Sequence, residues 1–369
     1  MDDSRLYQMA LSMVPGIGNV ITKTLISYCG SAKNIFTTNK NKLSKIPGIG
    51  EKTANSILKF NQFDEAEKEL IKCKDHQIDL LFFTDAKFPR RLKECIDAPV
   101  LLFSKGNFDL NESKVISIVG TRQATSYGRE FLEQFINHIA PHQPVIVSGL
   151  AYGIDVISHK EALKNKLSTI GVMASGMDII YPSSHKKYVY EMMENGGIVS
   201  EYKIGTIPDA HNFPSRNRII AGLSDATIVV EASEKGGALI TAEIANNYNR
   251  DVFAVPGNVG NNYSKGCNDL IKKHKANILT SAKDIEYYLN WEVGKVAESS
   301  YDDDQKWLEE LNKEEKHIVQ TILENENNML IDDLSWKTQI PLNFIATHIL
   351  NLEFKGIVKS LPGKRYRVK

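Results

Sequence analysis

Short apolar runs alternate with amphipathic stretches between residues 114 and 290. The runs are rich in β-branched residues, which is typical of parallel strands that are covered on both faces. The expected strands span 115–119, 145–147, 168–172, 197–200, 226–230 and 252–255. Helices are expected between them, most clearly over 127–139, 155–164 and 185–194. The pattern predicts an α/β core over 114–290, with a Rossmann-like parallel sheet and helices on both of its faces.

The first 75 residues show a different pattern, in which amphipathic helical stretches flank two similar glycine turns. The turns read Val-Pro-Gly-Ile-Gly at 14–18 and Ile-Pro-Gly-Ile-Gly at 46–50. Turns of this kind expose backbone N–H groups that bind a DNA phosphate, and Lys23 and Lys52 follow them at equivalent places. We therefore predict a helix-hairpin-helix-like helical domain over 1–75. Turns that serve only packing have the same sequence, so both interpretations stay open.

Residues 76–113 are expected to form a connector packed on the core, with short strands over 80–83 and 100–103. Within it, Arg90 and Arg91 are expected to lie in a solvated turn. The polar and acidic composition of 291–305 predicts a linker after the core.

The last segment, 306–369, predicts a winged-helix domain. Helical patterns span 313–324, 331–336 and 342–353, and strand patterns span 356–360 and 365–368. The helix at 342–353 contains no Lys or Arg, which argues against reading of the major groove. A protein-binding or regulatory module and phosphate contacts from the basic strands both remain open.

Composition and charge narrow the function classes. The 369 residues carry 45 basic and 45 acidic side chains, so net charge does not favour a protein that coats duplex DNA, although a local basic cleft is compatible with it. The four cysteines form no Cys-x-x-Cys pair, and neither a metal site nor a disulfide framework is indicated. Without a targeting segment or an apolar run that could span a bilayer, we expect a cytoplasmic protein with no membrane contact.

Unusual turns follow the predicted strands. Glycines, serines and polar residues gather at 120–122, 148–155, 174–178, 236–237 and 256–258, each at the carboxyl end of a strand. In an open α/β sheet these ends lie along one edge, where the ligand crevice is found. We therefore expect the turns to build a single binding site.

The side chains of this site suit an anion. Arg122 offers a bidentate donor to a phosphate, and Ser126 is expected to cap the helix that follows. Ser148 and Gly149 supply hydroxyl and backbone donors, and the glycine pair at 236–237 lets the backbone approach a ligand closely.

A second polar stretch, 212–218, opens a predicted helix in the same region. Arg216 and Arg218 lie there beside Asn217, and Phe213 provides a face on which a base can stack, as does Tyr152. Several phosphate donors in a row with an aromatic platform predict a site for a single strand of nucleic acid.

Cofactor and catalytic signals are missing. The sequence has neither the Gly-x-Gly-x-x-Gly fingerprint after the first strand nor a Walker A lysine, so we expect no nucleotide cofactor. Asp155 and His159 lie one helical turn apart, and we interpret them as a helix cap and its local partner rather than as a metal or catalytic pair. No nucleophile with a partnered base is visible, which predicts a protein that is not an enzyme.

Taken together, the turns resemble the bacterial DNA-processing protein A family, also called DprA or Smf. The resemblance covers nearly the whole chain and departs at Ala174, where members often have glycine, and at His274-Lys275, which replace a common Gly-Ala. The motifs are GTR at 120–122 with YG at 127–128, SGLAYGID at 148–155, YP at 181–182, FPSRNRII at 213–220, GALITA at 237–242, PG at 256–257 and SKGCN at 264–268.

This resemblance implies a protein that binds single-stranded DNA, protects it on entry and loads the RecA recombinase during natural transformation or related recombination. It also implies a homodimer formed through the Rossmann-like domain and no catalysis. Residue chemistry and motifs together give the DNA-binding candidates Gly120, Arg122, Ser126, Ser148, Gly149, Phe213, Ser215, Arg216, Asn217, Arg218, Gly236, Gly237, Thr241 and Lys265.

Two other readings stay open. The stretch 236–243 is similar to the G-G-x-G-T-x-x-E turn of nucleotide phosphoribohydrolases, with Glu243 in register for the acidic residue. Leu239 and Ile240 stand where Gly and Thr are needed, which weakens this enzyme hypothesis. An adaptor that docks partners through its last domain is the third reading, as an added role.

Overall fold

The computed structural model describes residues 3–291, 311–325, 329–361 and 365–368. The chain forms two compact units, residues 1–293 and residues 294–369. The first unit contains the large sheet with its helices, the connector and the N-terminal helical module. The second contains a small sheet and further helices, and each unit is described by itself. The predicted linker over 291–305 lies, beyond residue 291, outside the described residues.

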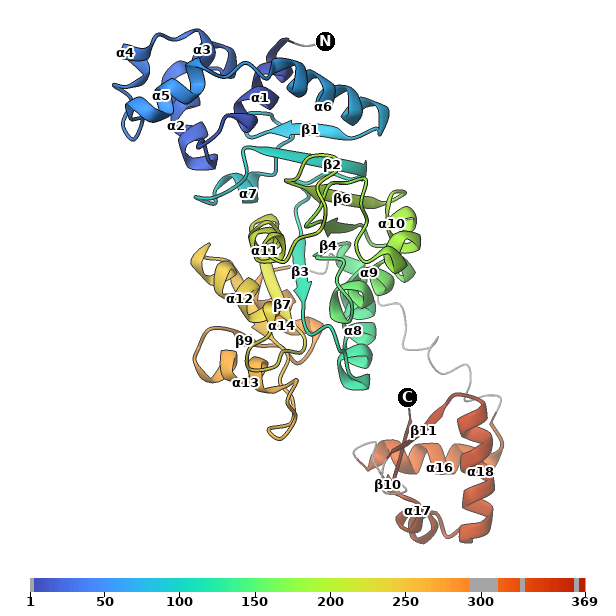
Figure 1. Ribbon diagram of the computed structural model, residues 1–369. Coiled ribbons are helices and arrows are strands. Elements are labelled where there is room, and N and C mark those ends of the chain that lie inside the picture. Colours follow the sequence, from blue (N-terminus) through green and yellow to red (C-terminus); the bar gives the residue numbers. More distant parts are fainter. Residues whose placement is uncertain (1–2, 292–310, 326–328, 362–364, 369) are drawn as a thin grey trace. The chain divides into compact units, whose positions relative to one another are not determined.

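A nine-stranded sheet forms the centre of the first unit, in the order β1-β2-β6-β5-β4-β3-β7-β8-β9 (Figure 1). Its strands are β1 Asp79–Phe82, β2 Leu101–Asn107, β3 Val115–Val119, β4 Val145–Ser148, β5 Thr169–Val172, β6 Gly196–Ser200, β7 Ala226–Val229, β8 Asp251–Ala254 and β9 Asn277–Ile278. The seven neighbouring strands β6-β5-β4-β3-β7-β8-β9 run parallel to one another. Strand β2 is antiparallel to β6, and β1 is antiparallel to β2. This arrangement confirms the predicted fold class, and every strand expected in the core is present within one residue of its expected bounds.

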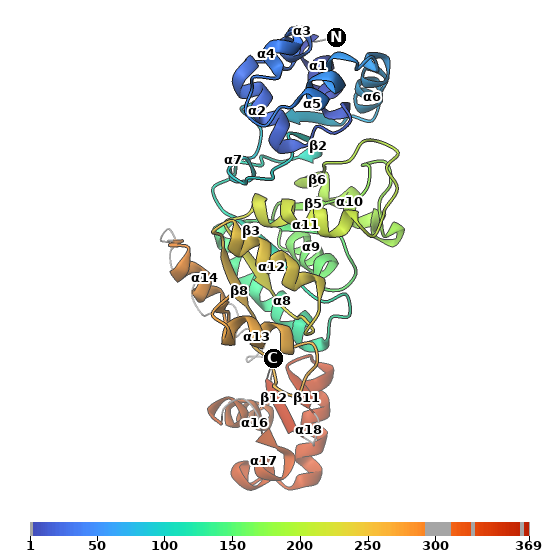
Figure 2. The same ribbon diagram turned by 60° about the vertical axis from the view of Figure 1, so that its left-hand side comes forward.

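Helices cover both faces of the sheet (Figures 1 and 2). Alternate residues of β3 show why: Val115 and Val119 belong to the apolar cluster on one face, and Ile116 and Ile118 to the cluster on the other. The first cluster includes residues of α11 Asn212–Leu223, α12 Gly237–Asn247 and α13 Lys265–Lys272. The second includes residues of α8 Ser126–Ile139, α9 Ile154–Lys164 and α14 Ala282–Tyr288. The remaining short elements are α7 Arg90–Lys93, η1 Ala140–His142, η2 Ser183–His185 and α10 Lys186–Met192.

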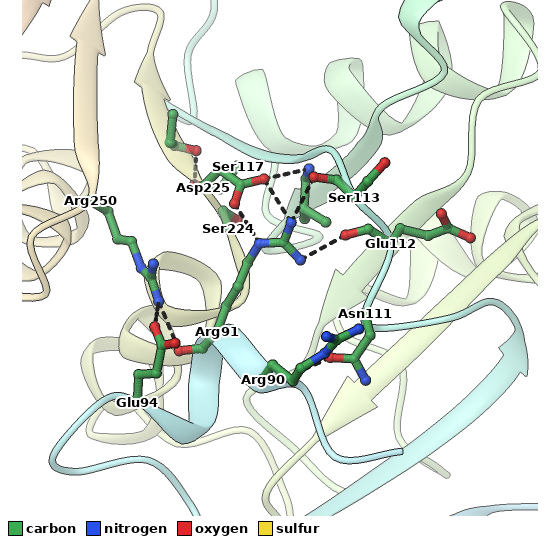
Figure 3. A network of polar contacts seen from close by, with 12 residues as sticks. Arg90, Arg91, Glu94, Asn111, Glu112, Ser113, Ser117, Ser224, Asp225 and Arg250 are labelled. Carbon is green, nitrogen blue, oxygen red and sulfur yellow. Dashed lines mark hydrogen bonds and ion pairs between the residues drawn. The ribbon is translucent and has the colours of Figure 1, made fainter. Parts of the chain in front are cut away.

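The connector is fixed to the sheet by Arg91, and the expectation of a solvated turn at this residue is wrong. Its guanidinium makes two hydrogen bonds to the carboxylate of Asp225, at 2.6 and 2.9 Å, just before β7 (Figure 3). It also donates to the carbonyl oxygens of Glu112 and Ser113. The same carboxylate accepts from the N–H of Val115, so one ion pair joins the connector to the starts of β3 and β7. A largely buried bidentate pair backed by backbone contacts orders a turn that is otherwise polar.

The N-terminal module consists of six helices, and the two glycine turns are among the connections between them. They are α1 Asp3–Met13, α2 Asn19–Cys29, α3 Ala32–Thr37, α4 Lys40–Leu43, α5 Glu51–Leu58 and α6 Phe63–Asp75. Gly16 and Gly48 both have φ of +80°, a conformation that only glycine adopts without strain. Gly18 and Gly50 then act as N-caps of α2 and α5 without a side-chain cap. The two turns are therefore equivalent in backbone geometry as well as in sequence.

Lys23 and Lys52, which follow the turns at equivalent positions, have different surroundings. Lys52 is exposed. The Nζ of Lys23 instead donates to the carbonyl oxygens of Cys95 and Ile96 in the connector, at 3.2 and 3.4 Å. Burial lowers the pKa of this lysine, partly offset by the charge of Asp97. The suggested phosphate contact of Lys23 is therefore replaced by a contact within the chain.

The second unit contains three described helices around one apolar cluster. They are α16 Lys313–Glu324, α17 Ile331–Thr338 and α18 Leu342–Phe354, with a sheet of β10 Met329–Leu330, β12 Arg365–Val368 and β11 Val358–Leu361. A capping box between Asn312 and Glu315 starts α16. The helices and strands follow the expected order, and assignment to the winged-helix class stays a prediction.

Candidate nucleic-acid interface

A cleft of about 640 Å³ opens at the carboxyl ends of β3 and β7. Its walls are the turn after β3, the first turns of α11 and the turn that leads into α12. The predicted site residues that line this cleft are Gly120, Arg122, Phe213, Arg216, Asn217, Gly236, Gly237 and Thr241. The turns at 120–122, 148–155 and 236–237 contribute lining residues, whereas those at 174–178 and 256–258 contribute none, so the expectation that all five turns build one site is met only in part.

Arg122 and Phe213 form the aromatic and cationic part of the cleft. The guanidinium carbon of Arg122 lies 5.7 Å from the centroid of the Phe213 ring, within the range of a cation–π contact. Arg122 is exposed, and among the described residues no carboxylate lies within ion-pair distance of it. Its charge is thus available to an anion, while the phenyl ring keeps the side chain from collapsing onto another surface.

The start of α12 adds backbone donors. This helix begins at Gly237 after the N-cap Gly236, and no side chain caps it. The first N–H groups of a helix have no partner within the helix, and they carry a partial positive charge. A strand-to-helix turn of this kind is a common binding place for a phosphate.

Arg216 lines the floor of the cleft, although its side chain is almost entirely buried. Its side chain is buried, one Nη donates to the carbonyl oxygen of Val172 at 2.7 Å, and its Nε has no partner among the described residues. Burial lowers the pKa of Arg216 to about 10, although the nearby carboxylate of Asp155 opposes this change. Gly149 makes room for the guanidinium, because a Cβ there would lie 2.0 Å from its Nη1. Arg216 therefore places positive charge in the cleft floor and holds the turns together.

Other candidates lie away from the cleft surface. Arg218 pairs with the carboxylate of Glu201, donates to the carbonyl oxygen of Asp97 and is largely buried. Ser148 is buried and donates to the carbonyl oxygen of Ile118 at 2.6 Å. These side chains support the turns that form the cleft, and they are not among the residues that line it.

Three further candidates are exposed outside the cleft lining. Lys265 pairs with Glu234 at 2.7 Å, and the hydroxyl of Ser215 donates to the carbonyl oxygen of His211. Ser126 is exposed and is the first residue of α8, but Thr125 is the N-cap, because its hydroxyl accepts the hydrogen bond from the N–H of Gly128. The expected capping role of Ser126 is therefore wrong by one residue.

Glu231 is a site residue that the sequence analysis missed. It follows β7, is buried, and its two carboxylate oxygens accept hydrogen bonds from the N–H and the hydroxyl of Thr125, at 2.9 and 2.6 Å. Its carbonyl oxygen also accepts the N–H of Thr121 at 2.7 Å. These contacts fix both ends of the turn that carries Arg122. A carboxylate directly after an apolar strand is unusual, and this position in the sequence could have identified Glu231 as a site residue.

The carboxylate of Glu231 also explains why the YG motif at 127–128 has a glycine at its second position. A Cβ on Gly128 would lie 2.3 Å from Oε2 of Glu231, so a larger residue there would displace the buried acid. Tyr263 was also missed: it lines the cleft, and its hydroxyl is hydrogen-bonded to the side chain of Gln123. It gives the cleft a second aromatic residue.

Asp155 and His159 do not partner each other, so the local capping interpretation is wrong. The N-cap of α9 is Gly153, and the Asp155 carboxylate accepts from the N–H of Ala151. Burial raises the pKa of Asp155 against the opposing charge of Arg216. The Nδ1 of His159 lies 2.7 Å from the hydroxyl of Thr169. Within the part of the chain that the structure describes, no group of His, Cys, Asp and Glu could hold a metal ion.

The enzyme reading depended on Glu243. Its carboxylate forms an ion pair with Lys275 at 2.7 Å, with both side chains about half exposed, and it is not part of the cleft lining. This position gives the hypothesis of a phosphoribohydrolase no support. None of the described helices combines the length and the apolarity that crossing a bilayer requires.

Family models match two parts of the chain. The model for DNA recombination-mediator protein A matches residues 79–290, and that for a SAM-like helix-hairpin-helix tandem matches residues 9–60. Protein Smf of Synechocystis sp. is 30% identical over 407 residues, which cover 99% of each chain. DNA processing protein DprA of Streptococcus pneumoniae is 42% identical over 201 residues, which cover 54% of this chain and 71% of that protein.

Two solved structures are similar to the chain. The X-ray structure of DprA from Streptococcus pneumoniae has a TM-score of 0.65 at 32% identity and covers 78% of this chain and 98% of its own. DNA processing protein A from Helicobacter pylori, whose structure concerns its single-stranded DNA binding mode, has a TM-score of 0.53 at 30% identity, with coverages of 58% and 96%. The matched residues and the full-length similarity to Protein Smf show that this chain belongs to the DNA recombination-mediator protein A family, to which DprA and Smf belong.

Proposed function

We propose that this protein binds single-stranded DNA in the cleft at the carboxyl ends of β3 and β7. The observation that carries the proposal is the exposed guanidinium of Arg122 over the Phe213 ring, opposite the uncapped start of α12. A phosphate suits the cation and the backbone donors, and an unpaired base suits the ring. The Helicobacter pylori relative, studied for its single-stranded DNA binding mode, supports the same ligand class.

The proposed role is non-catalytic. The bound strand is protected from degradation, and the protein loads the RecA recombinase onto it during natural transformation or related recombination, in the cytoplasm. Family membership and the cleft chemistry support this role, since the cleft offers donors and an aromatic ring without a partnered nucleophile among its lining residues. Incubation of the protein with nucleoside monophosphates is expected to release no free base, and release of base would instead support the enzyme reading.

Strand binding is tested by fluorescence anisotropy with labelled single-stranded and duplex oligonucleotides at two salt concentrations. The Arg122→Ala variant is expected to weaken single-strand binding by about tenfold at low salt, since one phosphate contact is lost. Arg90→Ala is the matched control, because Arg90 is an exposed arginine of the connector whose backbone N–H, rather than its guanidinium, binds Asn111. Equal affinity of the Arg122→Ala variant, the control and the native chain would contradict the proposed cleft.

Recombinase loading has its own assay. The native protein is expected to shorten the lag before RecA polymerises on a strand coated with a single-strand-binding protein, and Arg122→Ala is expected to restore the lag. If the native protein leaves the lag unchanged, the loading role is contradicted, and the proposal of strand binding is not affected.

A homodimer through the Rossmann-like domain is the remaining part of the proposal. The terminal strand β9 has only β8 as neighbour in the sheet, and Ile278 and Tyr287 nearby in sequence are exposed. An open edge with apolar residues favours pairing with a second copy. Light scattering is expected to give twice the monomer mass for the native chain and the monomer mass for Ile278→Lys with Tyr287→Glu. A native monomer at micromolar concentration would contradict dimerisation.

A further inference from the structure

An irregular segment, residues 201–211, joins the end of β6 to the start of α11. All of its residues are described, and they form neither helix nor strand; the segment is called the strap below. Ala210 near its end lines the cleft, and so does Phe213 just beyond it. An irregular segment keeps one conformation only where hydrogen bonds or packing hold it. The contacts that hold the strap therefore also decide where the ring of Phe213 lies.

One of these contacts comes from the helical module. Glu69 of α6 is buried, and its Oε1 accepts a hydrogen bond from the backbone N–H of Ile204 at 2.7 Å. Its other carboxylate oxygen lies 3.7 Å from the Nζ of Lys72. Ile204 also packs against the apolar cluster that includes Ala66 and Cys73 of α6. A carboxylate is buried only where such contacts offset its loss of water, and a charged acceptor makes a stronger hydrogen bond than a neutral one.

The turn after β5 holds the same part of the strap from another direction. The N–H of Gly205 donates to Oδ1 of Asp178 at 2.9 Å. The N–H of Gly176 donates to the carbonyl oxygen of Thr206 at 2.8 Å. A Cβ on Gly176 would lie 2.5 Å from the carbonyl oxygen of Lys203, so the backbones of strap and turn are in close contact. This turn does not line the cleft, yet it fixes the segment that leads there.

The end of the strap is linked to α11 by further hydrogen bonds. The side chain of Asp209 accepts the N–H of His211 at 2.8 Å, and its carbonyl oxygen accepts the N–H of Asn212 at 3.0 Å. The side-chain amide of Asn212 donates to a carbonyl oxygen of the turn after β5 at 3.2 Å. Phe213 follows directly in the chain. A displaced strap would therefore move the Phe213 ring relative to Arg122.

We propose that Glu69 is a positioning residue for strand binding: its carboxylate holds the strap, and the strap places the ring of Phe213 in the cleft. Glu69 is buried and does not line the cleft, so it acts through the strap and not by touching DNA. The inference rests on the proposed function of the cleft. It gives the helical module a role inside the strand-binding site of the sheet.

The test uses the full-length protein with Glu69→Leu and, separately, Glu69→Gln. Leucine fills most of the buried space but removes the acceptor, whereas glutamine keeps an oxygen for the N–H of Ile204. Glu67→Leu is the matched control, because Glu67 is an exposed residue of the same helix and its loss changes the net charge equally. Thermal unfolding of each variant gives the temperature below which affinity is measured.

Anisotropy with a labelled single strand is expected to show about fivefold weaker binding for Glu69→Leu than for Glu67→Leu, within the range of couplings in one hydrogen-bond network. Glu69→Gln is expected to bind as the native chain does, because the acceptor remains. The salt dependence is expected to stay native in all three variants, since no cation that faces the DNA is changed. Equal affinities of Glu69→Leu and Glu67→Leu would overturn the proposal.

A positioning role is separated from general support of the fold by combining Glu69→Leu with Phe213→Leu. If Glu69 acts by placing the ring, its loss has no further effect once the ring is gone. The double variant is therefore expected to bind as Phe213→Leu does. A further loss of about fivefold in the double variant would show that Glu69 supports the fold in general, and would overturn the positioning role.

Asp178→Ala tests the strap without a change in the core, because Asp178 is exposed, and it serves if Glu69→Leu does not fold. This variant is expected to weaken strand binding in the native chain and to have no effect in Phe213→Leu. Hydrogen exchange of the backbone amides of 201–211 is expected to be faster in Asp178→Ala and Glu69→Leu than in Glu67→Leu. Native exchange rates in both variants would show that neither residue holds the strap, and the proposal would be wrong.

Failure of this inference differs from failure of the proposed function. If Arg122→Ala weakens strand binding while Glu69→Leu and Asp178→Ala do not, the cleft stands and the positioning role is overturned. If Arg122→Ala binds as the native chain does, the cleft itself is contradicted, and the positioning role is overturned with it.

Discussion

The guanidinium of Arg122 lies 5.7 Å from the centre of the Phe213 ring, although Arg122 comes from the turn after β3 and Phe213 from the first turn of α11. One of them provides charge and the other provides an apolar surface, so their contributions to strand binding are separable by experiment. A charged contact depends on salt, and stacking on a ring does not.

Phe213→Leu is expected to weaken single-strand binding by about tenfold, because stacking contributes about 1 to 3 kcal/mol per base. The slope of the salt dependence is expected to stay that of the native chain, since no charge is lost. Phe213→Tyr serves as the control that keeps the ring. Anisotropy titrations at several salt concentrations measure both quantities, and a changed slope in Phe213→Leu would show that the ring acts by placing Arg122.

Arg218→Ala is expected to destabilise the protein rather than to remove a DNA contact. The Arg218 and Glu201 side chains are each 14% exposed, and breaking one partner of such a pair leaves a desolvated charge, which costs about 3 kcal/mol. Chemical denaturation measures this loss. Addition of Glu201→Gln to the variant is expected to recover part of it, because the orphaned charge is removed. If Arg218→Ala instead keeps the native stability and its DNA affinity depends less steeply on salt, Arg218 contacts the DNA.

Glu231→Gln is expected to weaken strand binding although this residue does not line the cleft. Its amide nitrogen would replace one of the two oxygens that accept from Thr125, and a buried donor left without an acceptor costs about 1 to 3 kcal/mol. The turn that carries Arg122 then loses its fixed position. Affinity is measured well below the unfolding temperature, with Thr125→Ser as a control that keeps the hydroxyl. A loss of stability with native affinity would show that Glu231 supports the fold alone.

Acid is expected to destabilise the first unit through His159. Burial lowers the pKa of His159 to about 3, and the charges of His185 and Arg216 act in the same direction. The unfolded chain binds a proton near pH 6.5 and the native chain does not, so stability rises with pH between about 3 and 6.5. From pH 7 to pH 5 the unfolding free energy should fall by about 2 kcal/mol.

Denaturation at both pH values with His159→Asn checks this expectation. The asparagine amide can keep a hydrogen bond to Thr169 and does not titrate, so the difference between the two pH values should shrink by the same amount. An unchanged pH dependence in the variant would assign the acid effect to other groups.

The core strands were predictable because their signal is local. The run at 115–119 is apolar at every position except Ser117, and β3 spans the same residues, buried on both faces. The glycine turns were predictable for a similar reason: a positive φ at Gly16 and Gly48 requires the residue that the sequence shows. Turn chemistry at strand ends also indicated where the cleft lies.

Pairings across the chain had no such signal. Arg91 and Asp225 are separated by 134 positions, and nothing near either residue identifies the other. The protein partners of Arg216 and Arg218 had no local signal either, because an arginine beside a helix start has the same sequence whether its partner is a ligand or a protein oxygen. Arg216 donates to the carbonyl oxygen of Val172, and Arg218 donates to the carboxylate of Glu201. Both partners are brought within reach only by the packing of α11 on the sheet.

The antiparallel strands β1 and β2 have a consequence for synthesis of the chain. One apolar cluster includes Met9 and Leu25 of the helical module, Leu101 of β2 and Ile198 of β6. During translation the module leaves the ribosome first, yet part of the surface that covers its core is not made until β6 emerges. The nascent module therefore lacks part of its apolar contact surface until the strand at 196–200 has been made.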